Sequence, residues 1–221
     1  MILLKVMEAK INSKVIAFTK SKLPYGWMGN MSPYPVSFMG KNWRTTEALF
    51  QALRFDDESI QELIRAEKSP MGAKLKAKSM ADKMTVAQLS VQDIKNMELC
   101  VRLKIEQYPK LKQQLIDTGE AYIYEDVTKR GDKGSNLTWG AMLINETWIG
   151  ENTLGEIWMK VRSELIENEN HVRELFETVD LIKSGYAGIL SNGNIVDRRK
   201  FPEAFLIHEN PLFGCPKPKD I

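Results

Sequence analysis

The sequence predicts a soluble α+β domain with a plausible cleft, and three observations support this prediction. The 221 residues are enough to bury a full core, either as one domain with an extension or as at most two domains. Several segments place apolar residues at helical spacing behind capping residues, which predicts helices. Short apolar runs between Gly, Pro and Asn predict a few short strands.

Composition excludes several classes of protein. Apolar residues make up 43% of the chain and charged residues 27%, which is ordinary for a globular protein. A net charge of +2 is too balanced for bulk neutralisation of nucleic-acid phosphates, although a nucleic acid contacted at one point is compatible with it. Cys100 and Cys215 form no disulfide framework and no metal pair, which predicts a reducing, cytoplasmic setting. We also expect no signal peptide and no membrane partner.

The central segment of the chain runs over residues 25–55, YGWMGNMSPYPVSFMGKNWRTTEALFQALRF. It begins as a loop broken by Gly and Pro, and continues as an extended run at 36–38 and a turn at 39–41. A helix then starts at Thr45 or Thr46, because either hydroxyl can cap it. This segment therefore joins an aromatic-rich loop to a helix.

The helix of the central segment carries a polar stripe. Glu47, Gln51 and Arg54 fall at i, i+4 and i+7, so they share one face. A polar stripe beside an aromatic-rich loop is typical of a small-molecule cleft. The alternative interpretation of the stripe alone is a solvated helix face.

The helix opened by Ser69 and Pro70 has a core-facing seam. Ser can cap a helix and Pro fits its first position. Apolar residues at i, i+4, i+7 and i+11 then predict which side is buried. Lys74 flanks this seam, at the border between buried and exposed positions. The seam consists of Ala73, Ala77, Met80 and Met84.

The other predicted elements rest on capping, stop and turn residues in the same way. They are a strand within 14–18, a short helix from a Ser59–Glu62 capping box to about Ala66, a helix opened at Ser90, a helix from Pro109 to Gly119, a strand over 121–125, an extended run over 141–148, a helix after 150–153, a helix over 171–183 and a hairpin around 191–194.

Residue chemistry leaves carboxylates, lysines and aromatic loops as candidates for catalysis. His171 and His208 are far apart and have no partners at metal-ligand spacing, and no nucleophile elbow, P-loop or dinucleotide fingerprint is found. We therefore expect no metal and no cofactor. Glu47 could shuttle protons and Lys74 could act as an amine nucleophile. The alternative interpretation of Lys74 is an ordinary surface lysine.

Five ordered blocks of the chain resemble the NADAR family, also called YbiA-like. The central segment is similar to the family's hallmark, and SPMGAKLKAK to its proline–alanine–lysine block. LIDTGEAYIYE resembles its Thr-Gly helix end with the following strand. LTWG and WIGENTLGEIWMKVR resemble its tryptophan–glycine and closing-helix motifs. The resemblance covers about residues 15–163.

Membership of this family implies a compact, helix-rich α+β domain that acts as an N-glycosidase on ribosyl–nitrogen bonds. Some members remove ADP-ribose from guanine in nucleic acid, and others cleave phosphoribosylated intermediates of riboflavin synthesis. The chemistry implied by the resemblance passes through a lysine Schiff base at the anomeric carbon, with no cofactor.

The resemblance also implies site residues, each at a matching position of a motif. Lys74 matches the catalytic lysine, and Glu47 matches the acidic residue at the head of the central helix. Lys74 becomes nucleophilic if burial or a neighbouring cation such as Lys78 favours its neutral amine. The residues implied to bind substrate are Asn30, Gln51, Trp139, Gly150, Asn152, Trp27 and Asn136, with Gly155 completing the glycine–asparagine block.

The chain departs from the family pattern at four positions. Asn136 stands where an aspartate is common, which removes an acid or sugar-hydroxyl acceptor and puts the substrate class in doubt. Asp132 or Glu125 could compensate for that change. The other departures are Met31 for an aromatic, Ala48 for a histidine and Lys78 for an arginine.

Two domains and three functions follow as expectations. Residues 1–163 form the catalytic domain, and residues 164–221 form an extension of helix, hairpin and tail. Its basic run 197–200 could contact phosphate, nucleic acid or a partner, or be plain surface. The favoured function removes ADP-ribose from guanine in nucleic acid. The alternatives are cleavage of phosphoribosylated riboflavin intermediates and a non-catalytic module that binds ADP-ribose.

Overall fold

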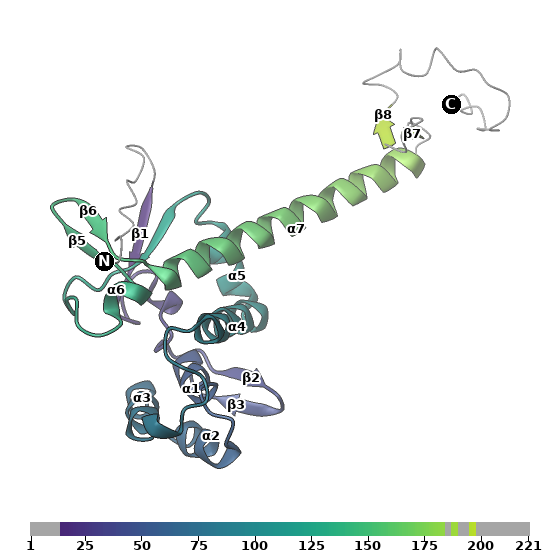
Figure 1. The fold of residues 1–221 in the computed structure, drawn as a ribbon. Helices are drawn as coiled ribbons and strands as arrows, with labels where there is room; N and C mark the ends of the chain where they lie inside the picture. Colours follow the sequence, from purple (N-terminus) through teal and green to yellow (C-terminus); the bar gives the residue numbers. More distant parts are fainter. Residues whose placement is uncertain (1–13, 184–186, 190–194, 198–221) are drawn as a thin grey trace, which may run out of the picture. The chain divides into compact units, whose positions relative to one another are not determined.

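The computed structural model describes residues 14–183, 187–189 and 195–197, and the chain divides into two compact units, Met1–Glu164 and Leu165–Ile221. Helices predominate, and the strands occur only as short two-stranded sheets (Figure 1). The α+β class expected from the sequence is confirmed.

A parallel strand pair joins two distant parts of the first unit. Strand β1 (Val15–Phe18) pairs with β4 (Tyr122–Glu125) in the register Val15↔Tyr122 to Phe18↔Glu125. Alternate residues of β1 are buried, as the period of a strand requires. Both strands were expected from the sequence.

An antiparallel hairpin precedes the central helix. A 3₁₀ helix, η1 (Gly26–Met28), leads to β2 (Val36–Phe38) and β3 (Lys41–Trp43). Met39 and Gly40 both have positive φ, 48° and 73°, which suits a two-residue turn of the primed type. The sequence predicted β2 and the turn but not β3.

Helix α1 (Thr46–Ala52) lies at the centre of the helical part of the first unit. The Thr45 hydroxyl accepts the Ala48 N–H at 3.2 Å and caps the helix, as expected. Every residue of α1 is buried, and the helix contacts α2 (Glu58–Arg65), α3 (Pro70–Ser79), α4 (Val91–Gln107) and β3, as Figure 1 illustrates. Side chains on different faces of α1 therefore meet different neighbours.

The expected cap of α2 is wrong by two residues. Asp57, not Ser59, caps the helix, because the Asp57 carboxylate accepts the Ser59 N–H at 2.8 Å. Glu62, expected to complete a capping box, instead pairs with Arg65 and Lys41. An aspartate two residues upstream competes successfully with the serine for the same role.

Helix α3 begins as expected but ends early. Ser69 accepts the Gly72 N–H at 3.0 Å, and Ala73 and Ala77 are fully buried. The helix stops at Ser79 and a 3₁₀ turn, η2 (Ala81–Lys83), follows it. Met84 therefore lies beyond the helix, and the predicted seam is one turn too long.

Helix α4 carries polar as well as apolar residues into the core. Ser90 caps it, as expected, and Met97, Val101 and Ile105 are buried along its inner side. Asp93 and Lys104 on the same helix have no exposed surface at all. Helix α5 (Pro109–Ile116) follows and ends before Gly119, which has φ 59°.

The segment between β4 and the last helix holds more structure than the sequence indicated. Residues expected to be loop form a short helix, α6 (Asn136–Trp139). The expected single extended run is a hairpin of β5 (Met142–Ile144) and β6 (Thr147–Ile149). Its turn uses two non-glycine residues at positive φ, which the sequence did not signal.

Helix α7 (Thr153–Lys183) is continuous, so the prediction of a separate helix starting at residue 171 is wrong. The composition change at 167–170 marks no helix end. Strands β7 (Ala187–Ile189) and β8 (Ile195–Asp197) pair antiparallel, which confirms the expected hairpin; its turn and residues 198–200 of the basic run lie outside the described residues.

Candidate active site

A series of hydrogen bonds begins at Asp93 of α4 and ends at Glu47 of α1. Asp93 of α4 holds Arg54 by two bonds, to Nε at 2.8 Å and Nη2 at 2.9 Å. Arg54 Nη1 donates to Gln51 Oε1 at 3.0 Å, and Gln51 Nε2 donates to Glu47 Oε1 at 2.9 Å. All four side chains are buried. The polar stripe predicted from the sequence is thus a fixed internal network, and the solvated-face interpretation is wrong.

Glu47 lies in an environment that favours its protonated form. Burial raises the pKa of Glu47 above its ordinary value, and the negative charge of Glu125 adds to this effect. The positive charges of Lys74 and Arg54 and the bond from Gln51 act in the opposite direction. Lys74 is thus close enough for its charge to act on Glu47, across the contact between α1 and α3.

Lys74 itself is exposed on α3, and so is Lys78 one turn further on. Lys74 is therefore not buried in the free protein, contrary to one of the two alternatives drawn from the sequence. Two charged groups remain whose fields reach the Lys74 amine: the neighbouring cation, Lys78, and the carboxyl group of Glu47.

Asn30 lies against the first turn of α1. Its carbonyl accepts the Glu47 N–H at 3.0 Å, and both its carbonyl and its side-chain oxygen accept the Thr46 hydroxyl at 3.2 Å. The Asn30 amide donates to the sulfur of Met97 and is buried. The loop before the hairpin is thus fastened directly beside Glu47.

Trp139 of α6 packs against the same helix, α1, although it lies much later in the sequence. Its ring packs edge-to-face on Phe50, with centroids 5.6 Å apart, while the Arg54 guanidinium covers Phe50 at 4.4 Å. Asn136, at the start of α6, donates to the Gly131 carbonyl at 2.9 Å. Helix α6 therefore brings a half-buried indole close to the network on α1.

The glycine–asparagine block has a structural part in the fold. Asn152 is 2% exposed, its amide donates to the Ile123 carbonyl at 2.8 Å, and its oxygen accepts the Glu125 N–H at 3.0 Å. Gly155 packs against the same carbonyl, and Gly150 packs against the Gly140 backbone, where a side chain would clash. These residues hold β4, and hence Glu125, against the start of α7.

Trp27 contacts side chains of α7 and α4. Its indole packs edge-to-face on the buried Trp158 at 5.3 Å. Its carbonyl accepts Lys104 Nζ at 2.9 Å, and that ammonium also bonds the Gly29 carbonyl and the Ser32 hydroxyl, each at 3.0 Å. Burial lowers the pKa of Lys104 to about 7.

Sequence reasoning missed Lys104 and Asp93 in this region, and named Glu125 only as a possible replacement for the aspartate that Asn136 lacks. Lys104 falls on the buried stripe of α4, three residues after Val101, so its spacing was a usable signal. Asp93 was taken only as part of a helix start, and nothing in the sequence pairs it with Arg54. Glu125 forms an ion pair with Arg130 at 2.7 Å and acts on Glu47 through its charge.

Among the described residues, no group of His, Cys, Asp and Glu is arranged to hold a metal ion. The helices within those residues include none that is long and apolar enough to cross a membrane. The chemistry available near Glu47 thus comes from a buried carboxyl group, an exposed amine, an amide, and an aromatic ring.

Comparison with known proteins finds one family over nearly the whole first unit, and it is the family that the sequence motifs resemble. The NADAR domain model matches residues 17–166. N-glycosidase YbiA of Escherichia coli (strain K12) is 30% identical over 153 residues, which are 68% of this chain and 88% of that protein. The same protein of Shigella boydii is 30% identical over 154 residues, with the same coverage.

One further relative and one solved structure extend this comparison. A riboflavin biosynthesis protein of Vibrio vulnificus is 28% identical over 171 residues, which are 73% of this chain but 41% of that protein. The NMR structure of E. coli YbiA superimposes with a TM-score of 0.59 at 27% identity, covering 74% of this chain and 91% of that one.

Proposed function

This chain belongs to the NADAR domain family and is an N-glycosidase, and we propose that it removes ADP-ribose from ADP-ribosylated guanine in nucleic acid through a Schiff base on Lys74. One observation carries the proposal: the charge of Lys74 on α3 acts on the buried carboxyl group of Glu47 on α1. This effect supports a site in which Lys74 acts as the nucleophile and Glu47 as the proton shuttle.

In the proposed first step, Lys74 Nζ attacks the anomeric carbon of the ribose. A bond from Nζ to that carbon forms, the bond from the carbon to the guanine nitrogen breaks, and the proton that this nitrogen needs comes from Glu47. The bond from the same carbon to the ring oxygen then breaks, Nζ passes a proton to that oxygen, and the protonated imine forms between Nζ and the carbon. The raised pKa of Glu47 supports this role, because a protonated carboxyl group can donate. Glu47 leaves the step as a carboxylate.

In the second step, water adds to the imine carbon, and the hydroxyl group formed there passes its proton to Nζ as the bond from this carbon to Nζ breaks. Glu47 takes the proton that the water loses and is ready for another cycle. Lys74 is recovered as the amine and ADP-ribose leaves as the free sugar. The bonds from Asp93 through Arg54 and Gln51 keep the Glu47 carboxyl group in one orientation throughout.

The exposure of Lys74 favours a large substrate. An N-ribosyl bond within a nucleic acid requires an open groove, and an amine at the surface of α3 is compatible with that requirement. Binding of the ribose over Lys74 would exclude water and favour the neutral amine only when substrate is present. We assign Trp139 to the base and Asn30 to the ribose in this arrangement.

A phosphoribosylated riboflavin intermediate is the second candidate substrate. The observation in its favour is the relative from Vibrio vulnificus, which is named as a riboflavin biosynthesis protein. The same Lys74 chemistry applies to its ribosyl–nitrogen bond, so the two candidates differ only in substrate.

A trapping experiment tests the proposal. The protein is incubated with an ADP-ribosylated guanine oligonucleotide or with a phosphoribosylated riboflavin intermediate, borohydride is added, and adducts are located by mass spectrometry. We expect a reduced adduct on Lys74 with the oligonucleotide, none with Lys74→Ala, and an undiminished adduct with Lys95→Ala, which removes an exposed lysine of α4, as the control. An adduct with the riboflavin intermediate alone would select the second substrate.

Turnover by Lys74→Ala at the wild-type rate would exclude the Schiff base. Binding of ADP-ribose by the wild-type protein without turnover of either substrate would favour a non-catalytic module over the proposed reaction.

A further inference from the structure

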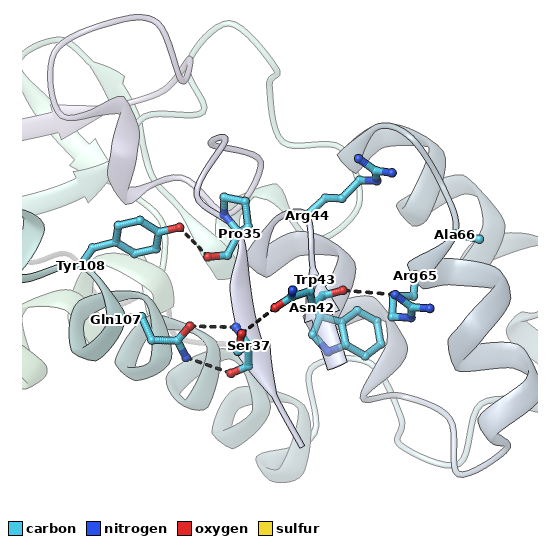
Figure 2. A pocket seen from close by; sticks show the side chains of 9 residues that line it. All are labelled: Pro35, Ser37, Asn42, Trp43, Arg44, Arg65, Ala66, Gln107 and Tyr108. Carbon is cyan, nitrogen blue, oxygen red and sulfur yellow. Dashed lines mark hydrogen bonds between the residues drawn. The ribbon is translucent and has the colours of Figure 1, made fainter. Parts of the chain in front are cut away.

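A separate pocket lies on the β2–β3 hairpin, between the carboxyl ends of α2 and α4. Its volume is about 740 Å³, within the range of small-molecule sites. Figure 2 shows its lining side chains, which include Asn42, Trp43, Arg44, Arg65, Gln107 and Tyr108. Neither Glu47 nor Lys74 lines it, and neither of its arginines is among the charges that shift the pKa of Glu47.

The walls of this pocket are held in place by side-chain bonds across the hairpin. Gln107 of α4 accepts the Ser37 N–H at 2.8 Å and donates to the Ser37 carbonyl at 2.9 Å, as an additional strand would. Tyr108 donates to the Pro35 carbonyl at 2.6 Å (Figure 2). The pocket is thus preformed, and a ligand does not have to order its backbone.

The hydrogen-bonding groups left over in the pocket are donors. Trp43 is 3% exposed, and its buried Nε1–H has no hydrogen-bond partner among the described residues. The Arg44 guanidinium is exposed and makes no hydrogen bond or ion pair within the described part of the chain. The unpaired guanidinium of Arg44 is accessible from the pocket, so an occupant rich in acceptors would be favoured here.

The charges around the pocket also favour an anion. No lining residue is acidic. Arg65 and Lys41 share one carboxylate, Glu62, and their hydrogen bonds lower the pKa of Glu62 to about 2. Lys41 and Arg65 thus share the charge of a single carboxylate, and Arg44 has no acidic partner among the described residues. The partial negative charges at the carboxyl ends of α2 and α4 oppose an anion but are smaller than a full charge.

We propose that this pocket is a second ligand site, which binds a phosphorylated small molecule with two or more negative groups between Arg44 and Arg65. Phosphate oxygens only accept hydrogen bonds, which matches the unused donors, and guanidinium groups bind phosphate in a fixed, bidentate geometry. The volume exceeds what a single phosphate fills, so a diphosphate or a nucleotide is the expected class. This site is additional to the proposed glycosidase site and independent of it.

NMR of the tryptophan side chains in the full-length protein distinguishes the two sites. Inorganic pyrophosphate is titrated into ¹⁵N-labelled protein at constant ionic strength, and the indole signals of Trp43 and Trp139 are followed after assignment by Trp→Phe variants. We expect the Trp43 signal to shift with saturation while the Trp139 signal stays in place. A shift of the Trp139 signal alone would mean that pyrophosphate binds near Lys74 and would overturn the proposal.

Two variants separate specific binding from general attraction. Arg44→Gln removes an exposed side chain, so folding should be unaffected, and it should weaken pyrophosphate binding about tenfold or more, the usual effect of losing a charge-assisted bond. Lys20→Gln removes one positive charge elsewhere and should leave the dissociation constant unchanged. Equal weakening by both variants, or no saturable Trp43 shift, would overturn the proposal.

Discussion

At the scale of single residues, Glu47 should limit the stability of the fold at neutral pH. Its pKa is raised in the folded state, so its contribution is full below the ordinary value of 4.5 and is lost as pH rises through the folded pKa. Glu47→Gln should therefore be more stable than wild type at pH 7, and the difference should shrink toward pH 4. Urea unfolding at several pH values measures it.

The control for this experiment is Glu120→Gln, which changes an exposed carboxyl group. It should show no comparable pH-dependent gain. If Glu47→Gln and wild type had equal stability from pH 4 to pH 7, the buried carboxyl group would have an ordinary pKa and its proposed role as a proton donor would lose support.

Lys104 should give the protein a second pH dependence, of opposite sign. Its pKa is about 7 when folded and 10.5 when unfolded, so between these values the unfolded chain binds more protons and stability rises with pH. The slope approaches about 1.4 kcal/mol per pH unit at most. In Lys104→Met, the free energy of unfolding should change less between pH 7 and pH 10 than in the wild type. Urea unfolding at several pH values measures this difference.

Lys95→Met is the matched variant, since Lys95 is an exposed lysine of the same helix. It should keep the wild-type slope. An unchanged slope in Lys104→Met would show that the ammonium is stabilised fully by the two carbonyls and the hydroxyl that it bonds.

At the scale of elements, the contact between β4 and α7 is possible because residue 155 is a glycine and has no side chain. A Cβ there would collide with the Ile123 carbonyl and the Asn152 amide. Gly155→Ala should destabilise the protein by about 1–3 kcal/mol, even though alanine is the better helix former. Thermal and urea unfolding measure the loss.

Gly29→Ala serves as its control. Gly29 has φ −67° and an added Cβ would meet only one atom, at 3.4 Å, so the substitution should be nearly neutral. Equal stability of Gly155→Ala and Gly29→Ala would mean that β4 can move away from α7 without loss.

Elements governed by local signals could be predicted from the sequence. Thr45, Ser69 and Ser90 each cap the helix expected of them, because a cap depends on residues three positions away. The β5–β6 turn was missed because Asn145 and Glu146 are not the glycine-bearing pair that marks such turns. The continuity of α7 was missed because the polar residues at 167–170 were interpreted as a boundary between two helices. Their helix propensities are in fact too close to those of other residues to end a helix.

The candidate site was predictable only along α1. The spacing of Glu47, Gln51 and Arg54 fixes a common face, and the structure links the three by hydrogen bonds. Partners from other elements were not predictable, because spacing carries no information on distances across a fold. Asp93, 39 positions from Arg54, illustrates this limit. The roles of Lys74, Trp139 and the other proposed residues stay predictions.

At the scale of the whole molecule, we expect glycosidase activity to reside in the first unit. Every residue expected or proposed to contact substrate lies between residues 27 and 152, within Met1–Glu164. A chain ended after residue 170 should therefore keep kcat/KM within about threefold of the full chain, less than 0.7 kcal/mol of transition-state stabilisation. Steady-state kinetics on the same substrate measure this.

Circular dichroism of the shortened chain supplies the control for folding. A fragment that folds but has lost activity would assign part of the site to residues 171–221 and would contradict the proposed division of the chain.

The parallel pairing of β1 with β4 has a consequence for synthesis on the ribosome. Val15 finds its partner only when Tyr122 has been made, and the helices α1 to α5 are translated in between. Because translation adds about 5–20 residues per second, β1 has no partner strand for at least several seconds after its synthesis. The unit therefore closes only after α1 to α5 have been made, and pairing over such a sequence separation is intrinsically slow. The nascent chain would gain most from a chaperone during this interval.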